Sequence, residues 1–186
     1  MKKTEIDPAK PFSHLVKVGH ISGSPLEMNL KADAQQLQGL ATLWGVLSVD
    51  RLDANIKISR WKRDGARVKG KVTAKVVQAC VVSLDPVESE IDEEFDELYV
   101  PEGSKLARAP AADAGEIVLD PDGPDMPETF QGDAIDVGAV ITEFAALGID
   151  PYPRKPGLDF EAHIEDKAED DRKPSPFAAL KAWKKE

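Results

Sequence analysis

Cysteine is nearly absent from this 186-residue sequence, which holds one, and aromatic residues make up only 6% of it. A single cysteine excludes an internal disulfide framework and any site built from several thiolates, and it fits a reducing compartment. No apolar run approaches the roughly 20 residues of a membrane span, and the first residues contain no signal-peptide core. We therefore expect a soluble, cytoplasmic protein with no membrane partner.

The sequence also lacks the patterns that carry common catalytic and cofactor chemistry. His14, His20 and His163 lie far apart, the glycines fit no phosphate-binding loop, and the acidic residues form no calcium-binding loop. Cys80 has no second cysteine or histidine near it in the sequence, and its simplest interpretation is a small buried residue at a strand end. We predict no catalytic residue, no metal site and no cofactor. An enzyme with Cys80 as nucleophile is the least favoured alternative.

Charge is abundant, and its two signs are separated along the chain. The formal net charge is −10, which disfavours a protein whose whole surface is basic. Residues 1–84 carry +7, residues 85–136 carry −15, and residues 137–186 carry −2. This block pattern marks either two binding surfaces of opposite sign or only two solvated faces that keep the protein in solution.

Periodicity predicts regular structure in the first part of the chain. Alternation of apolar and polar residues over 26–31 predicts a strand. Apolar residues at helical spacing then predict a helix over 34–44, with Asp33 and Gln36 as a capping pair and Gly45 as its stop.

Two longer alternating segments, 51–59 and 68–76, predict a β-hairpin. Both apolar sets have even residue numbers, so the loop between the strands should contain an odd number of residues. Like charges directly opposite each other are unfavourable, and we therefore expect Ile58 opposite Val72, a register that keeps the lysines of the two strands apart.

The rest of the chain is predicted to hold an acidic strand, an insertion and a second helix. Residues 87–99 alternate as one strand or two with a nearly all-acidic outer face. Residues 102–134 have the composition of a mobile acidic insertion, with one short strand near 117–119. The second helix should begin after Asp136 and stop at Gly148.

Residues 158–186 form a charged tail in this prediction, and its end carries Phe177, Leu180 and Trp183 at a spacing of three. About ten residues cannot hold a helix alone, so this segment should dock on its own body or on a partner. The elements together predict one α+β domain over 1–186, with a mainly antiparallel sheet, two main helices and a short C-terminal helix.

The basic hairpin is the strongest local signal of binding. Its wet face and turn combine cations with an exposed ring, which suits phosphate contact and base stacking. The candidate RNA-binding residues are Lys57, Arg60, Trp61, Arg63, Arg67, Lys69, Lys71 and Lys75. Two alternatives stay open: surface lysines also prevent aggregation through strand edges, and Trp61 could fold back into the core.

The acidic strand and the apolar stripe of the tail are candidates for binding a protein. The candidate residues are Glu90, Asp92, Glu94, Asp96, Phe177, Leu180 and Trp183. An acidic protein-binding adaptor or chaperone without RNA contact would use these residues alone, and it is the alternative function.

Three short blocks occur in an order that is specific to one family. The first is the run from Val68 to Val87, the second covers 135–154 and ends in the sequence Leu-Gly-Ile-Asp-Pro-Tyr-Pro-Arg, and the third is 176–180. In these blocks the chain resembles the YceD family, the large ribosomal RNA subunit accumulation proteins. The resemblance covers most of the chain outside the insertion.

The resemblance implies a non-enzymatic role in the accumulation, processing or assembly of 23S ribosomal RNA of the large subunit. The implied partners are ribosomal RNA or a large-subunit assembly intermediate, and a basic ribosomal protein; a monomer is favoured. Many members carry a Cys-x-x-Cys pair in the first block and another cysteine pair after the second helix, which suggests a metal clip. Here only Cys80 is present, with Ser83 where the second cysteine would fall, so a zinc site is not carried over.

Overall fold

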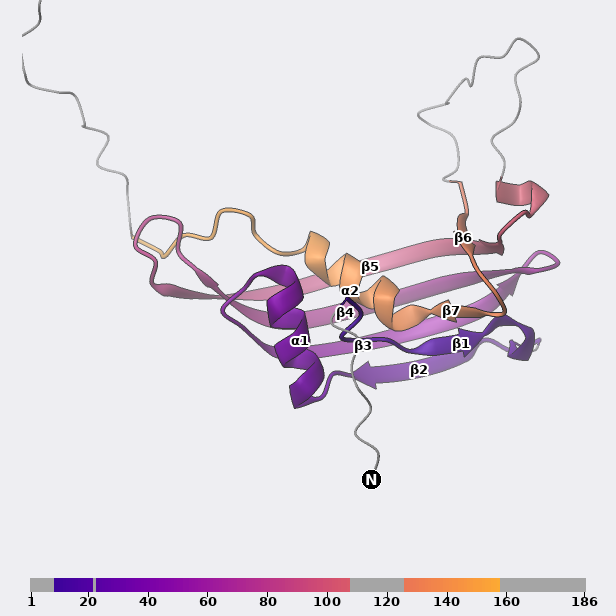
Figure 1. The fold of residues 1–186 in the computed structure, drawn as a ribbon, viewed down its shortest axis with the longest axis horizontal. Coiled ribbons are helices and arrows are strands. Elements are labelled where there is room, and N and C mark those ends of the chain that lie inside the picture. Colours follow the sequence, from indigo (N-terminus) through magenta and orange to yellow (C-terminus); the bar gives the residue numbers. More distant parts are fainter. Residues whose placement is uncertain (1–8, 22, 108–125, 158–186) are drawn as a thin grey trace, which may run out of the picture. The chain divides into compact units, whose positions relative to one another are not determined.

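A five-stranded sheet dominates the computed structural model, which describes residues 9–21, 23–107 and 126–157 (Figure 1). In spatial order its strands are β2 (Leu26–Lys31), β3 (Ser48–Trp61), β4 (Gly65–Ala79), β5 (Pro86–Pro101) and β6 (Glu128–Phe130). Neighbouring strands are antiparallel except β5 and β6, which are parallel. The elements named here and below all belong to the unit of the chain that ends at Pro156.

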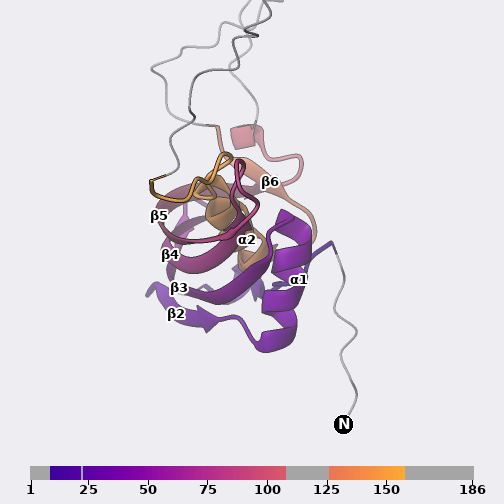
Figure 2. The same ribbon diagram turned by 90° about the vertical axis from the view of Figure 1, so that its left-hand side faces the viewer.

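Two helices cover one face of this sheet, as the end-on view in Figure 2 shows. Helix α1 (Ala34–Trp44) packs mainly on β3, and helix α2 (Val137–Leu147) packs on β4 and β5. A small second sheet pairs β1 (Leu15–Lys17) with β7 (Ala134–Asp136), directly before α2. Two single 3₁₀ turns complete the described elements, η1 (Val18–His20) and η2 (Lys105–Ala107).

Both helices begin and end where the sequence predicts. The Asp33 carboxylate accepts hydrogen bonds from the backbone N–H groups of Gln35 and Gln36, each at 2.9 Å. The Gln36 side chain in turn accepts the backbone N–H of Asp33 at 2.9 Å, which completes a capping box. Gly45, with φ of 66°, closes α1 in the left-handed conformation that glycine adopts without strain. Asp136 caps α2.

The core lies between the sheet and the two helices. Inward-facing side chains of the three long strands meet those of the helices and are fully or almost fully buried. Leu52, Ile58, Val68, Val72, Leu40 and Ile141 are among the most buried. Phe95 of β5 stacks on Phe144 of α2, with ring centroids 4.8 Å apart, and this contact fixes α2 on the sheet.

The loop of the β3–β4 hairpin has an odd number of residues, as predicted. Trp61 pairs with Gly65, so the loop consists of the three residues 62–64. Lys62 adopts a left-handed conformation with φ of 54°, and this residue turns the chain between the strands.

The predicted register of this hairpin is wrong. Ile58 lies opposite Val68 and not opposite Val72, and Lys57 lies directly opposite Lys69. The prediction considered only the two strands of the hairpin. In the folded sheet β2 lies beside β3 and β5 lies beside β4, and their carboxylates neutralise the two facing lysines.

Residues 102–134 contain more regular structure than the composition predicts. The turn η2, the strand β6 and the start of β7 fall within them. The predicted strand near 117–119 and the predicted C-terminal helix lie outside the described residues. Two helices and mostly antiparallel sheets agree with the α+β class in broad terms, although strands dominate over helices.

Candidate functional site

Most of the candidate cations lie on the outer face of the sheet, the face that points away from α1 and α2. Along β3 and β4 the even-numbered side chains are directed into the core, so the odd-numbered lysines point to solvent. The register aligns Glu27, Lys57, Lys69 and Asp96 in one row across four strands. The two lysines are in the middle of this row, with Glu27 beside Lys57 and Asp96 beside Lys69.

The same arrangement repeats along the sheet as a set of ion pairs. The N···O distances are 3.1 Å for Lys57–Glu27, 2.7 Å for Lys69–Asp96, 2.7 Å for Lys71–Asp92 and 2.8 Å for Lys75–Glu88. Arg67 donates from two nitrogens to the two oxygens of Asp96, each at 2.6 Å. Five of the eight candidate RNA-binding residues thus have a carboxylate partner within the fold.

The ion pairs also shift pKa values in the direction that keeps the charges in place. Hydrogen bonding to Arg67, with a further contribution from Lys69, lowers the pKa of Asp96 to about 2 against the opposing effect of partial burial. The hydrogen bond to Asp92 raises the pKa of Lys71. The charged forms of Asp96 and Lys71 are therefore stabilised by their partners in the sheet.

The two charge blocks of the sequence meet on this face. The basic strand β4 lies beside the acidic strand β5 over their whole common length. Much of the net charge of +7 over residues 1–84 and of −15 over residues 85–136 is therefore compensated by pairing within the protein. Opposite charges on β4 and β5 favour the pairing of these two strands, and this role of the charge pattern does not depend on a binding partner.

The hairpin turn differs from the outer face of the sheet because, among the described residues, its cations have no carboxylate partner. Within the part of the chain that the structure describes, Arg60, Lys62 and Arg63 form no ion pair. The Arg60 guanidinium donates to the backbone carbonyl of Arg63 at 2.7 Å. The Lys62 ammonium lies 4.5 Å from the centre of the Trp61 ring, a cation–π contact that holds this ring in the turn.

A cavity of about 310 Å³ opens beside the turn. It lies between the turn, the η1 segment and the residues after β6, and its lining includes Arg60, Arg63, Asp64, Phe130 and Asp133. Unpaired guanidinium groups beside a hollow are suited to contact with phosphate and with an unstacked base.

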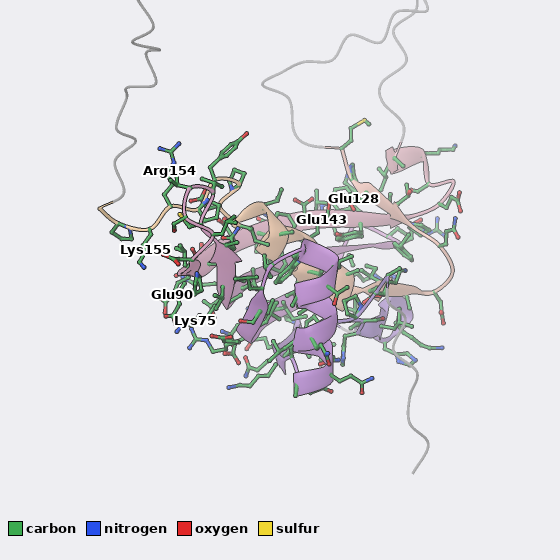
Figure 3. The ribbon with its side chains drawn as sticks, turned by 60° about the vertical axis from the view of Figure 1, so that its left-hand side comes forward. Lys75, Glu90, Glu128, Glu143, Arg154 and Lys155 are labelled. Atoms are coloured by element: carbon green, nitrogen blue, oxygen red, sulfur yellow. The ribbon has the colours of Figure 1, made fainter. Side chains whose placement is uncertain are left out.

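The acidic candidates lie on β5, on the same face as the lysines. Asp92 and Asp96 are in the ion pairs described above, and Glu94 lies 3.7 Å from Lys71. Glu90 lies directly opposite Lys75, which can be followed in Figure 3, and both side chains stand at the exposed surface of the sheet. The other partner-binding candidates, Phe177, Leu180 and Trp183, lie outside the described residues.

The sequence gives no signal for a set of contacts that joins the turn between β4 and β5, residues 80–85, to the segment after α2. The N–H of Val81 donates to the carbonyl of Pro153 at 2.9 Å, and the side-chain amide of Gln78 donates to the carbonyl of Asp150 at 2.8 Å. An exposed ion pair between Lys155 and Asp85, at 3.1 Å, joins the same two segments. Arg154 and Lys155 are labelled at this end of the molecule in Figure 3.

Cys80 lies at the centre of these contacts and is fully buried. Hydrogen bonding of its thiol to the backbone of Ser83, and further to the Ser83 side chain and the backbone of Lys155, lowers its pKa to about 6. Among residues 9–21, 23–107 and 126–157, no group of three or more His, Cys, Asp or Glu side chains is arranged to hold a metal ion.

The fold and its surface define an α+β protein with a charge-paired sheet face and a basic hairpin turn. Residues 68–184 of the chain match the model of one protein family, described as large ribosomal RNA subunit accumulation protein YceD. The match covers more than half of the chain, and the protein belongs to this family. No curated protein matches the chain, and no solved structure matches it.

The matched residues begin within β4 and include β5, α2 and the contacts around Cys80. The hairpin turn with Arg60 and Arg63 precedes them. In the described part of the chain no helix is both long and apolar enough to cross a membrane.

Proposed function

We propose that this protein is a non-enzymatic, cytoplasmic factor that supports the accumulation, processing or assembly of 23S ribosomal RNA of the large subunit. The family supports the involvement with large-subunit ribosomal RNA. The described part of the chain offers charged surfaces and no group of side chains suited to a metal, and these features favour binding over catalysis as its contribution.

The contact with RNA is made by the hairpin turn in this proposal, and the observation that carries it is the pairing of charges. The lysines of the sheet face are held by carboxylates of β2 and β5, so a phosphate would have to displace an intramolecular partner. Arg60, Lys62 and Arg63 have no such partner among the described residues. Phosphate therefore need not displace an ion-paired carboxylate to reach these three cations, and Trp61 adds a ring on which a base stacks.

The acidic strand β5 contacts a basic ribosomal protein in the same proposal. Its sequence contains seven acidic residues and no Lys or Arg. Only four cations of β4 compensate them: Lys69, Lys71 and Lys75 lie directly opposite an acidic residue, and Arg67 reaches Asp96 from its position opposite Leu98. The remaining negative charge attracts a basic partner.

A deletion strain tests the function as a whole. Ribosomes of the strain are separated on a sucrose gradient and 23S RNA is quantified, and the expected result is a loss of large subunits that the wild-type gene restores. The double variant Arg60→Glu/Arg63→Glu should fail to restore them, whereas Lys75→Gln, which changes a paired cation of the sheet face, should succeed. Normal large-subunit levels in the deletion strain would contradict the proposed function.

An adaptor that binds only protein is the second candidate, and the excess of carboxylates on β5 favours it. The same double variant separates the two candidates, because an adaptor without RNA contact keeps its function when the turn is made acidic. Restoration of large subunits by Arg60→Glu/Arg63→Glu would therefore select the adaptor.

A further inference from the structure

Among the described residues, one edge of the main sheet is open along most of its length. Strand β5 pairs with β4 from Pro86 to Tyr99, but on its other side it pairs with β6 only over Tyr99–Pro101. No strand within the described ranges pairs with residues 86–98 on that side. An open edge presents a row of backbone N–H and C=O groups that can accept a further strand.

The backbone groups of alternate residues point out of this edge. The N–H of Glu102 donates to Phe130 of β6 at 2.9 Å, so even-numbered residues at this end of β5 direct their backbone groups away from β4. Because the direction alternates along a strand, the same holds for Glu90, Asp92 and Glu94. These residues also carry carboxylates on the outer face of the sheet.

Charge decides which strand this edge accepts. A second copy of the chain would bring seven acidic residues of its own β5 against these seven, and like charges directly opposite each other are unfavourable. Nucleic acid is repelled for the same reason. An extended segment with Lys or Arg at alternate positions would place its cations beside the outer-face carboxylates while its backbone pairs with the open edge.

We propose that the edge of β5 binds an extended, basic segment of a partner protein as an added β-strand. This inference deepens the proposed function and rests on it for the kind of partner, a basic protein. The pairing of backbone groups gives affinity. The carboxylate of Glu90, for which the described residues provide no ion pair, and the excess of acidic residues on β5 over cations on β4 select for basic residues at every second position of the segment.

Amide hydrogen exchange on the full-length protein tests the strand addition directly. The probe is a synthetic peptide in which lysine and threonine alternate, and its control is the same peptide with every backbone nitrogen methylated, which keeps the charge but removes all backbone N–H donors. At a peptide concentration about ten times its Kd, exchange at Glu90, Asp92 and Glu94 should slow about tenfold. The amides of Ile91 and Glu93, which point to β4, should not change. Equal binding of both peptides, or no change at the three edge amides, would overturn the proposal.

A pair of variants at one residue separates backbone pairing from charge. Proline is tolerated on an edge strand where the N–H faces solvent, so Glu94→Pro should fold and should reduce peptide binding at least tenfold. Glu94→Thr removes the same charge but keeps the N–H, and it should bind within about threefold of wild type, because one exposed charge pair contributes little to affinity. Peptide binding by Glu94→Pro at wild-type affinity would contradict strand addition. If Glu94→Pro does not fold, the exchange experiment on the wild-type protein decides.

The RNA-contact variant keeps the two proposals distinguishable. Arg60→Glu/Arg63→Glu changes the hairpin turn and leaves the β5 edge intact, so it should bind the peptide as wild type does. Peptide binding together with normal 23S RNA in the deletion strain would remove the proposed function alone. Loss of 23S RNA in that strain without peptide binding would remove strand addition alone.

Discussion

Gly70 shows how one residue makes room for the contact between the sheet and α2. A Cβ atom at this position would lie 2.5 Å from the Cζ atom of Phe95, 2.8 Å from a methyl group of Ile56 and 3.0 Å from the carbonyl of Asn55. Phe95 cannot move away without losing its stacking on Phe144. The alternation of the sequence places Gly70 on the inward face but does not reveal this requirement.

We predict that Gly70→Ala destabilises the protein by about 1–3 kcal/mol, because the added methyl overpacks the core. The free energy of unfolding in urea measures the loss. Gly23→Ala is the control, since no atom lies within 4 Å of a Cβ built there. Equal stability of the two variants would mean that the core around Phe95 adjusts freely.

The bidentate pair of Arg67 and Asp96 predicts a dependence of stability on pH. The pKa of Asp96 is about 2 in the folded protein, below the ordinary value of about 3.9 in an unfolded chain. The stabilisation is therefore complete above pH 4 and is lost as the pH falls from about 4 to 2. Because the pair is largely exposed, solvent screening keeps its contribution small.

Asp96→Asn should accordingly be less stable than wild type at pH 7 and equally stable at pH 2, as measured by urea unfolding at both values. The matched control is Asp64→Asn, at a carboxylate of the hairpin loop for which the described residues provide no ion pair. A constant difference between Asp96→Asn and wild type at both pH values would show that the hydrogen bonds, and not the ionisation of Asp96, stabilise the fold.

At the scale of elements, helix α1 depends on the residue that caps its N-terminus, Asp33. The carboxylate of Asp33 accepts two backbone N–H groups that have no partner inside the helix. We predict that Asp33→Ala lowers the free energy of unfolding by about 1 kcal/mol, whereas Asp33→Asn changes it by a few tenths, because asparagine caps as well as aspartate. The urea midpoint measures both, and an unchanged m-value verifies that the folded state is the same. A similar loss in both variants would indicate that charge, and not capping, is responsible.

Helices and strands could be predicted where residues close together in the sequence determine them. The boundaries of α1, the cap of α2, the long strands and the odd hairpin loop follow from periodicity and capping residues such as Asp33 and Asp136. The register of the hairpin could not be predicted from the hairpin, because Glu27 and Asp96 on neighbouring strands decide whether Lys57 tolerates Lys69 opposite it. The three-residue strands β1, β6 and β7 carry too short a pattern to stand out.

At the scale of the whole molecule, the charge of the sequence acquires a different meaning once the strands are paired. The net charge and the two blocks predict charged surfaces, but only the pairing of β4 with β5 reveals that the blocks meet on one face. Sequence reasoning therefore named candidate residues without separating the compensated from the uncompensated cations. That separation depends on distances between strands, which no local pattern contains.

The number of uncompensated cations predicts how RNA binding depends on salt. Each phosphate contact on single-stranded RNA contributes about −0.7 to the slope of log K against log[salt], so three cations of the turn should give a slope of roughly −2. If all seven cationic candidates contacted phosphate, the slope would be roughly −5. Fluorescence anisotropy with a labelled single-stranded fragment of 23S RNA at several KCl concentrations distinguishes these values.

Variants with glutamine in place of a cation then test whether the cations of the turn cause this salt dependence. Arg60→Gln/Arg63→Gln should bring the slope to about −0.7, since one cation of the turn remains. Lys69→Gln should leave it near −2, because Lys69 is already paired with Asp96 and Arg67 still holds that carboxylate. A fall of the slope in Lys69→Gln comparable to that in the double variant would mean that RNA competes successfully with β5 for the lysines of the sheet, and the RNA contact would then extend from the turn onto the sheet face.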